Sequence, residues 1–140
     1  MPMSPEPVAD QVWRMMSAVV IDNKDAWRRA AVNRTGLPFS RIRILRRLSR
    51  HPMTVKQVAE AATLDAPAAT VAVNDLESRG LVSREIDPEN RRCKLVSLTD
   101  AGRKVVAILD EIEDPAPPAL AELGSQDLAA LHRILAKLGR

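Results

Sequence analysis

The stretch from residue 54 to residue 80 contains start and stop signals for two helices that only a tight link separates. Thr54 and Gln57 have the spacing of a capping box, in which a hydroxyl and an amide each bond a backbone N–H of the first turn. The segment "TVKQVAEAA" therefore predicts a short helix, and "TLD" is the link to the next one. So short a link sets the two helices at a steep angle, which predicts a helix-turn-helix.

The second of these helices, "DAPAATVAVNDLESRG", contains no Lys or Arg in its first ten residues. Asp65 or Ala66 caps it, and Pro67 stands in its first turn, where the missing N–H costs nothing. Gly80 ends it in a left-handed conformation. The helical period predicts one buried face, made of Ala69, Ala72, Val73 and Leu76. More to the opposite side lie Ala68, Thr70, Val71 and Asn74.

Two helices are predicted before this pair. Residues 6–36 form one long helix that Asp22-Asn23 interrupts, and residues 40–51 form a second helix with Ser40 as its N-cap. The second helix directs its apolar side chains inward and leaves its arginines more exposed. These arginines are Arg43, Arg46, Arg47 and Arg50.

A hairpin and two helices are predicted after the pair. The strands are residues 81–86 and 93–98, joined by the turn "DPENRR". Thr99 caps a helix over residues 100–114, and Ser125 caps the last helix, beyond the break at "PAPP". The fold class is mostly α with a small β wing: a winged helix-turn-helix with about six helices and a two- to three-stranded hairpin.

Charge is unevenly distributed along the 140 residues, whose formal net charge is only +3. Residues 41–56 contain six basic side chains and no acid, whereas residues 110–127 contain six acids and no base. This separation predicts a polyanion-binding face and a separate solvated or assembly face. Aromatic residues make up only 2% of the chain, so its core is expected to be aliphatic, a composition that favours helices.

The segment "DLESRGLVSREIDPENRRCKLVSLTDAGR" resembles the signature of the MarR family of bacterial regulators. That signature runs approximately D-x-L-E-x-x-G-L-V-x-R, then D-P-x-D-x-R, then L-T-x-x-G. The resemblance implies one domain over residues 1–140, with a winged helix-turn-helix lobe at about 38–100. It also implies dimerisation helices at about 6–35 and 100–140, which make the protein an obligate homodimer on a pseudo-palindromic operator.

Residue by residue, the resemblance places Arg92 where the family has its wing-tip arginine and Arg84 where an arginine closes the "GLVxR" block. Asn90 departs from the aspartate that usually holds the tip arginine, and Asp87 is a candidate substitute. Val71 is a second departure, because many family members have an arginine near this position of the recognition helix.

Without that arginine, Thr70 and Asn74 are the candidate polar base readers, and an asparagine can pair with adenine. Val71 and Ala68 are expected to pack on thymine methyl groups, so the predicted operator is rich in A·T pairs under this helix. Phosphate affinity is assigned to the basic residues around it. These are Arg41, Arg43, Lys56, Arg84, Arg91, Arg92 and Lys94.

The expected function is transcriptional repression by a homodimer that occupies a site near a promoter on double-stranded DNA. The alternative is a winged-helix protein–protein interaction module with weakened DNA binding. The lack of basic residues in the first ten positions of the helix at residues 65–80 favours this alternative. No metal-ligand cluster, Gly-rich phosphate loop or nucleophile elbow is present in the sequence, so neither enzymatic activity nor a cofactor is expected. A cytoplasmic protein without a membrane span is expected.

Two further features keep their alternatives. Cys93, the single cysteine, is either an inert strand residue, which is favoured, or a redox sensor. Trp13, Trp27, Met15 and Met16 either pack at the dimer interface, which is favoured, or line a cleft for a small aromatic effector, as the family resemblance suggests.

Overall fold

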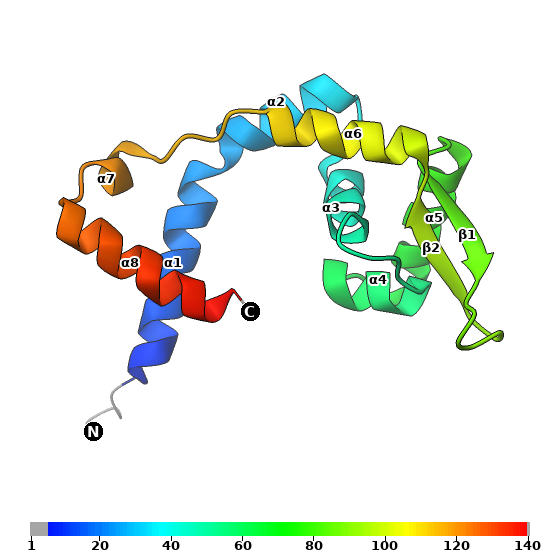
Figure 1. Ribbon diagram of the computed structural model, residues 1–140, viewed down its shortest axis with the longest axis horizontal. Helices are drawn as coiled ribbons and strands as arrows, with labels where there is room; N and C mark the ends of the chain where they lie inside the picture. Colours follow the sequence, from blue (N-terminus) through cyan, green and yellow to red (C-terminus); the bar gives the residue numbers. More distant parts are fainter. Residues whose placement is uncertain (1–5, 140) are drawn as a thin grey trace.

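The computed structural model describes residues 6–139, which form eight helices and one antiparallel pair of strands (Figure 1). The helices are α1 (Val8–Asn23), α2 (Asp25–Thr35), α3 (Phe39–Leu48), α4 (Val55–Ala62), α5 (Ala66–Ser78), α6 (Asp100–Glu111), α7 (Pro118–Ala121) and α8 (Ser125–Leu138). The strands are β1 (Val82–Ile86) and β2 (Lys94–Leu98). The mostly helical winged fold is thus confirmed.

The number of helices exceeds the predicted six for two reasons. The expected interruption of the first helix is real and falls at Lys24, which separates α1 from α2. Beside it, the Asn23 side chain donates to the carbonyl of Val19 at 2.7 Å. The second addition is the single turn α7, which begins at Pro118 because a proline fits the first position of a helix.

A small lobe made of α3, α4, α5 and the hairpin contains most of the core. Ile42, Leu45, Val73, Leu76 and Val96 are completely buried there. The hairpin is attached to the lobe by an isolated bridge: Met53 N–H donates to the carbonyl of Val96 at 3.1 Å, and Val96 N–H donates back at 2.7 Å. The described residues thus contain two strands and one isolated bridge beside them, which matches the expected two- to three-stranded hairpin at its lower number.

The caps of α4, α5 and α6 are those that the sequence predicts. Both bonds of the capping box between Thr54 and Gln57 are present. Asp65 accepts a hydrogen bond from the N–H of Ala68, and Thr99 accepts one from the N–H of Gly102. Each fixes the start of its helix by satisfying a backbone N–H that the helix leaves without a partner.

Two predicted caps are wrong. Ser40 lies inside α3, whose N-cap is Pro38, and Ser125 is the first residue of α8, whose N-cap is Gly124. Neither α3 nor α8 has a side-chain cap. Ser125 is already the first helical residue of α8 and Ser40 the second of α3, so each hydroxyl stands one or two positions too late to reach the orphan N–H groups.

Helices α1 and α8 lie at the end of the molecule away from the wing (Figure 1), and neither contains a buried residue. Their apolar side chains are instead exposed. On α1 these include Val8, Val12, Trp13, Met15, Val19, Val20 and Ile21, and on α8 they include Leu131, Ile134, Leu135 and Leu138. The described chain therefore leaves two helices with uncovered apolar faces.

Candidate nucleic-acid interface

Helix α5 presents an exposed face opposite its buried one. Ala69, Ala72, Val73 and Leu76 are fully buried, as predicted. Near the middle of the opposite face are Val71, whose residue is 61% exposed, and Asn74, which is also exposed. The five helical residues before Val71 have no charge, so the exposed face at the start of the helix is uncharged.

The other two predicted readers on α5 are placed differently. Thr70 is exposed, and its hydroxyl donates to the carbonyl of Ala66 at 3.0 Å. Ala68 is half-buried and lies toward the flank of the helix. The structure thus brings Thr70, Val71 and Asn74 together on the exposed face and sets Ala68 at its edge.

Arg84 on β1 reaches across to α5. Its Nη2 donates to Oδ1 of Asn74, and its Nε lies 3.7 Å from Oε2 of Glu77. The side chain is only 23% exposed, and its Nε is buried without a hydrogen-bond partner. Arg84, expected to bind phosphate, is therefore engaged with the recognition helix.

Arg41 on α3 is engaged as well. Its Nε donates to Oδ2 of Asp75 at 2.9 Å, and Arg79 Nε donates to the same oxygen at 3.1 Å. The hydrogen bond from Arg41, and then that from Arg79, lower the pKa of Asp75 against the opposing effect of desolvation. The side chain of Arg41 is 20% exposed, so it joins α3 to α5 while keeping only a small solvent-facing edge.

Asp75, Arg79 and the Asn74–Arg84 bond are the site features that sequence reasoning missed. The spacing of Asp75 and Arg79, four residues apart on a helix, is a signal for an ion pair. The contacts of Arg41 and Arg84 have no such local signal, because their partners are 34 and 10 residues away.

The wing tip holds cations that have no acid partner within residues 6–139: Arg91, Arg92 and Lys94, all exposed. The turn is shaped by its own short side chains. Oδ1 of Asp87 accepts from the N–H of Glu89 at 2.9 Å, and Oδ1 of Asn90 accepts from the backbone N–H of Arg92 at 3.2 Å. The Asp87 carboxylate thus accepts a hydrogen bond from the backbone, and in the described residues it makes no hydrogen bond to the guanidinium of Arg92.

The arginines of α3 divide into two groups. Arg46 pairs with Asp110 of α6 at 3.4 Å. An ion pair of this kind is expected on a solvated helix face that packs near acids of the same chain. Arg43 is exposed, Arg47 is half-buried, and Arg50 is exposed just beyond the end of α3; in the described part of the chain none of the three pairs with an acid. Burial lowers the pKa of Arg47, and the charges of Arg43 and Arg50 lower it further. Lys56 on α4 is also exposed and without an acid partner there.

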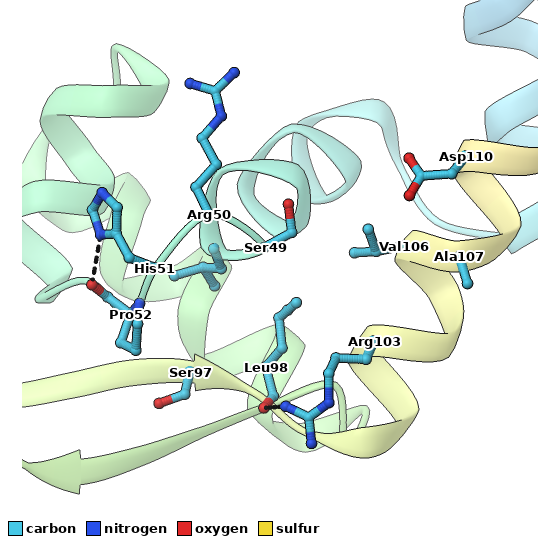
Figure 2. Close-up of a pocket in the computed structure, with 11 residues that line it drawn as sticks. Ser49, Arg50, His51, Pro52, Ser97, Leu98, Arg103, Val106, Ala107 and Asp110 are labelled. Carbon is cyan, nitrogen blue, oxygen red and sulfur yellow. Dashed lines mark hydrogen bonds between the residues drawn. The ribbon is translucent and has the colours of Figure 1, made fainter.

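A cavity of about 450 Å³ lies between the end of α3, β2 and α6 (Figure 2). Its polar groups do not converge. His51 Nδ1 is 3.0 Å from the carbonyl oxygen of Pro52, Arg103 Nη1 donates to the carbonyl of Leu98 at 3.1 Å, and the guanidinium of Arg50 extends away (Figure 2). An oriented ligand needs convergent polar groups, so this cavity does not define a binding site.

A second cavity, of about 370 Å³, lies beside Trp27. Lys24 Nζ is 5.0 Å and Arg46 Cζ 5.3 Å from the Trp27 ring centroid, within the range of cation–π contacts. Asp114 and Asp110 pair with these two cations. Trp27 itself is half-buried against the core, whereas Trp13 is 67% exposed on α1. The two tryptophans thus have different surroundings.

Other site classes leave no trace in the described residues. Between residues 6 and 139, no group of three or more His, Cys, Asp and Glu residues is arranged to hold a metal ion. Over the same range, no helix is long and apolar enough to cross a bilayer.

A short capped helix, a tight turn, a second helix with an exposed face and a basic hairpin together define a winged helix-turn-helix. The MarR family model matches residues 35–92, which cover these elements up to the wing tip. Over residues 35–92 the chain thus matches the MarR family, whose members are transcriptional regulators.

Similar proteins agree with this assignment. The HTH-type transcriptional regulator YdgJ of Bacillus subtilis (strain 168) is 33% identical over 107 residues, which are 74% of this chain and 65% of YdgJ. The chain thus spans somewhat less than two thirds of that relative. Apo MarR from E. coli superposes with a TM-score of 0.69 at 17% identity, covering 98% of this chain and all of MarR.

CouR from Rhodococcus jostii RHA1, solved with bound p-coumaroyl-CoA, gives a TM-score of 0.67 at 24% identity, with 96% and 95% of the two chains covered. At these identities, both structures support the fold alone.

Proposed function

We propose that the protein is a sequence-specific DNA-binding transcriptional repressor that acts as a homodimer on a pseudo-palindromic, promoter-proximal operator. The exposed face of α5 carries this proposal, because unpaired cations precede it on α4 and follow it on the wing. A helix of this kind fits a major groove about 12 Å wide, while the hairpin follows the adjacent backbone or minor groove.

In this proposal, base contacts and phosphate contacts are made by different residues. Thr70, Val71 and Asn74 face base edges, with Ala68 at the margin. Phosphates are bound chiefly by the cations without acid partners in the described chain: Arg43, Lys56, Arg91, Arg92 and Lys94. Arg41 and Arg84 contribute less directly, because Asp75 and Asn74 already hold them. Selection of bound sequences from a random library tests the A·T-rich contact, and a strong guanine preference under α5 argues against it.

The uncovered apolar faces of α1 and α8 support the homodimer. A helix whose Leu131, Leu135 and Leu138 are all exposed needs a cover, and a second copy supplies one with matching faces. Leu135→Glu should therefore shift the sedimenting species from dimer to monomer, whereas Gln126→Glu, at the polar start of the same helix, should not. A Leu135→Glu protein that stays dimeric would place the interface elsewhere.

A mobility-shift assay on the protein's own upstream region, repeated over a range of salt, tests DNA binding. Each phosphate contact adds about 0.9 to the slope of log affinity against log salt. Arg92→Ala removes one contact per subunit, so the slope of the dimer should fall by about 2. Arg29→Ala, which removes an exposed arginine of α2, is the matched control and should leave the slope unchanged. An unchanged slope in Arg92→Ala would show the wing assignment to be wrong.

The rival function is protein–protein interaction through α5. The 61% exposed Val71 and the lack of charge at the start of the helix favour it. DNA binding measured at low salt distinguishes the two functions. If the wild-type protein does not bind any DNA there, the interaction module is the better explanation.

A small aromatic effector is proposed for the cavity beside Trp27. The Trp27 ring suits a small aromatic compound, and CouR was solved with an aromatic CoA ester. Small aromatic compounds should quench the fluorescence of Trp27, measured in a Trp13→Phe background. They should also weaken DNA binding, since a ligand that favours a different spacing of the two recognition helices shifts the dimer away from the operator.

A further inference from the structure

We propose that Asn74 reads the operator as a hydrogen-bond donor only, and that it selects the N7 atom of a purine rather than pairing with adenine through two bonds. This inference rests on the proposed DNA-binding function, and it concerns what one residue of the recognition helix recognises.

The contact with Arg84 fixes the orientation of the Asn74 amide. A guanidinium has five N–H donors and no acceptor, so Nη2 of Arg84 can only meet the oxygen of the amide. Oδ1 of Asn74 is therefore turned toward β1. The other end of the amide, Nδ2, is left on the exposed side of α5 and has no partner among residues 6–139.

Arg84 is itself held in place, so the amide is not free to turn over. Its side chain is 23% exposed, and Oε2 of Glu77 stands 3.7 Å from Nε. That Nε is buried and makes no hydrogen bond, so the Asn74 oxygen is the acceptor on which the buried guanidinium depends. Turning the amide would leave the guanidinium facing an NH₂ group, which is a donor.

This orientation changes which base edge Asn74 can read. An asparagine that recognises adenine accepts from N6 with its oxygen and donates to N7 with its nitrogen. One lone pair of the oxygen is engaged by Arg84 and the oxygen is turned toward β1, so the group that Asn74 presents on the exposed side of α5 is the N–H donor Nδ2. Donation to N7 is then its contact, and both purines offer that acceptor in the major groove. The sequence-based expectation of an Asn74–adenine pair is thereby narrowed to a single contact that tolerates guanine.

Atomic substitution in the DNA tests this directly. Selection from a random library with wild type and with Asn74→Ala identifies the base pair whose preference depends on Asn74. Replacing the purine there with its 7-deaza analogue should lower affinity about 3- to 10-fold, the loss expected for one hydrogen bond. Where that purine is adenine, removing its 6-amino group should leave affinity within about twofold. The opposite pattern, sensitivity to the 6-amino group and tolerance of 7-deaza, overturns the proposal.

Asn74→Asp separates reading from a merely structural role. A carboxylate would bind Arg84 through a charge-assisted bond, so both roles predict equal or better stability. Its negative charge weakens binding to any DNA, so a structural role predicts the same loss of affinity on the purine operator and on non-specific DNA. A reading role predicts a loss at least 10-fold larger on the purine operator, because a carboxylate faces N7 without a donor. Thermal unfolding of the variant checks its fold.

The failures of the two proposals are distinguishable. Wild-type protein without sequence-specific binding overturns the proposed function and this inference together. Specific binding that is insensitive to 7-deaza substitution, or a selection that Asn74→Ala does not alter at any position, overturns this inference alone.

Discussion

Replacing Gly102 with alanine should destabilise the protein, because it forces two backbone segments apart. Gly102 is buried in the first turn of α6, where a Cβ atom would lie 2.1 Å from the carbonyl oxygen of Leu81 and 3.2 Å from Cδ2 of Leu98. The carbonyl belongs to the backbone and cannot rotate away as a side chain would. Helix α6 and the residue before β1 must therefore separate by about 1 Å to restore van der Waals contact.

The magnitude follows from the contacts that this separation disturbs. Thr99 N–H donates to the carbonyl of Leu81 at 3.1 Å, and the Thr99 hydroxyl donates to the carbonyl of Gly80 at 2.6 Å. Losing one such bond costs about 1 kcal/mol, and overpacking adds about 1–3 kcal/mol. The better helix propensity of alanine returns about 1 kcal/mol. The free energy of unfolding should fall by about 2 kcal/mol, which lowers Tm by about 5–10 °C.

Urea unfolding followed by circular dichroism, at one protein concentration, measures this change. Gly139→Ala is the matched control, because its Cβ would meet only the Leu135 carbonyl oxygen at an ordinary 3.8 Å. The control should stay within about 0.5 kcal/mol of wild type. If Gly102→Ala unfolds at the same urea concentration as the control, with the same cooperativity, the close approach of α6 to Leu81 is not a constraint and the reasoning is refuted.

Three further predictions concern stability. Two arginines lower the pKa of Asp75, so the contribution of Asp75 to the free energy of unfolding is complete above the ordinary carboxyl pKa of about 4. This contribution is lost as the pH falls through the lower pKa of the folded state. Between pH 7 and 3 the urea midpoint should therefore fall more steeply in wild type than in Asp75→Asn. Thr63 ends α4 with φ of 57°, a left-handed conformation, so Thr63→Gly should raise the urea midpoint by the equivalent of about 0.5–1 kcal/mol, and a lower midpoint would contradict this. Thr54→Ala removes the hydroxyl of the capping box and should cost about 1 kcal/mol by thermal unfolding; an unchanged Tm would show that the cap does not hold α4.

The parts of the fold that the sequence predicted are those with short-range causes. Thr54 and Gln57, Asp65 with Pro67, and Thr99 act within four residues, so their geometry is decided by local spacing. The buried face of α5 follows from helical periodicity alone. Ser40 and Ser125 show the limit of this reasoning. A serine near a helix start caps it only at one position, and the sequence does not specify which residue begins the helix.

The candidate site was less predictable, because the sequence shows which residues are basic but not which of them are already paired. Arg41 finds Asp75 only after α3 packs on α5, and Arg84 finds Asn74 only when the hairpin folds back on α5. Arg91 and Arg92, at the tip of a hairpin, form no ion pair within the described chain. Whether a cation is available to a polyanion is thus a property of packing, which local patterns do not encode.

The same pairing explains why a basic protein has so bare a recognition helix. Two acceptors of α5 are engaged by arginines of the protein itself: Asp75 holds Arg41 and Arg79, and the oxygen of Asn74 holds Arg84. Little charge is left on the exposed face, so in the proposed function phosphate affinity has to come from α3, α4 and the wing. Base preference and salt dependence should then be altered by different substitutions. Changes at Asn74 should shift the selected sequence at a constant salt slope, whereas changes at Arg92 should reduce the slope without changing the sequence under α5. A single substitution in α5 that altered both would mean that α5 also binds the phosphate backbone.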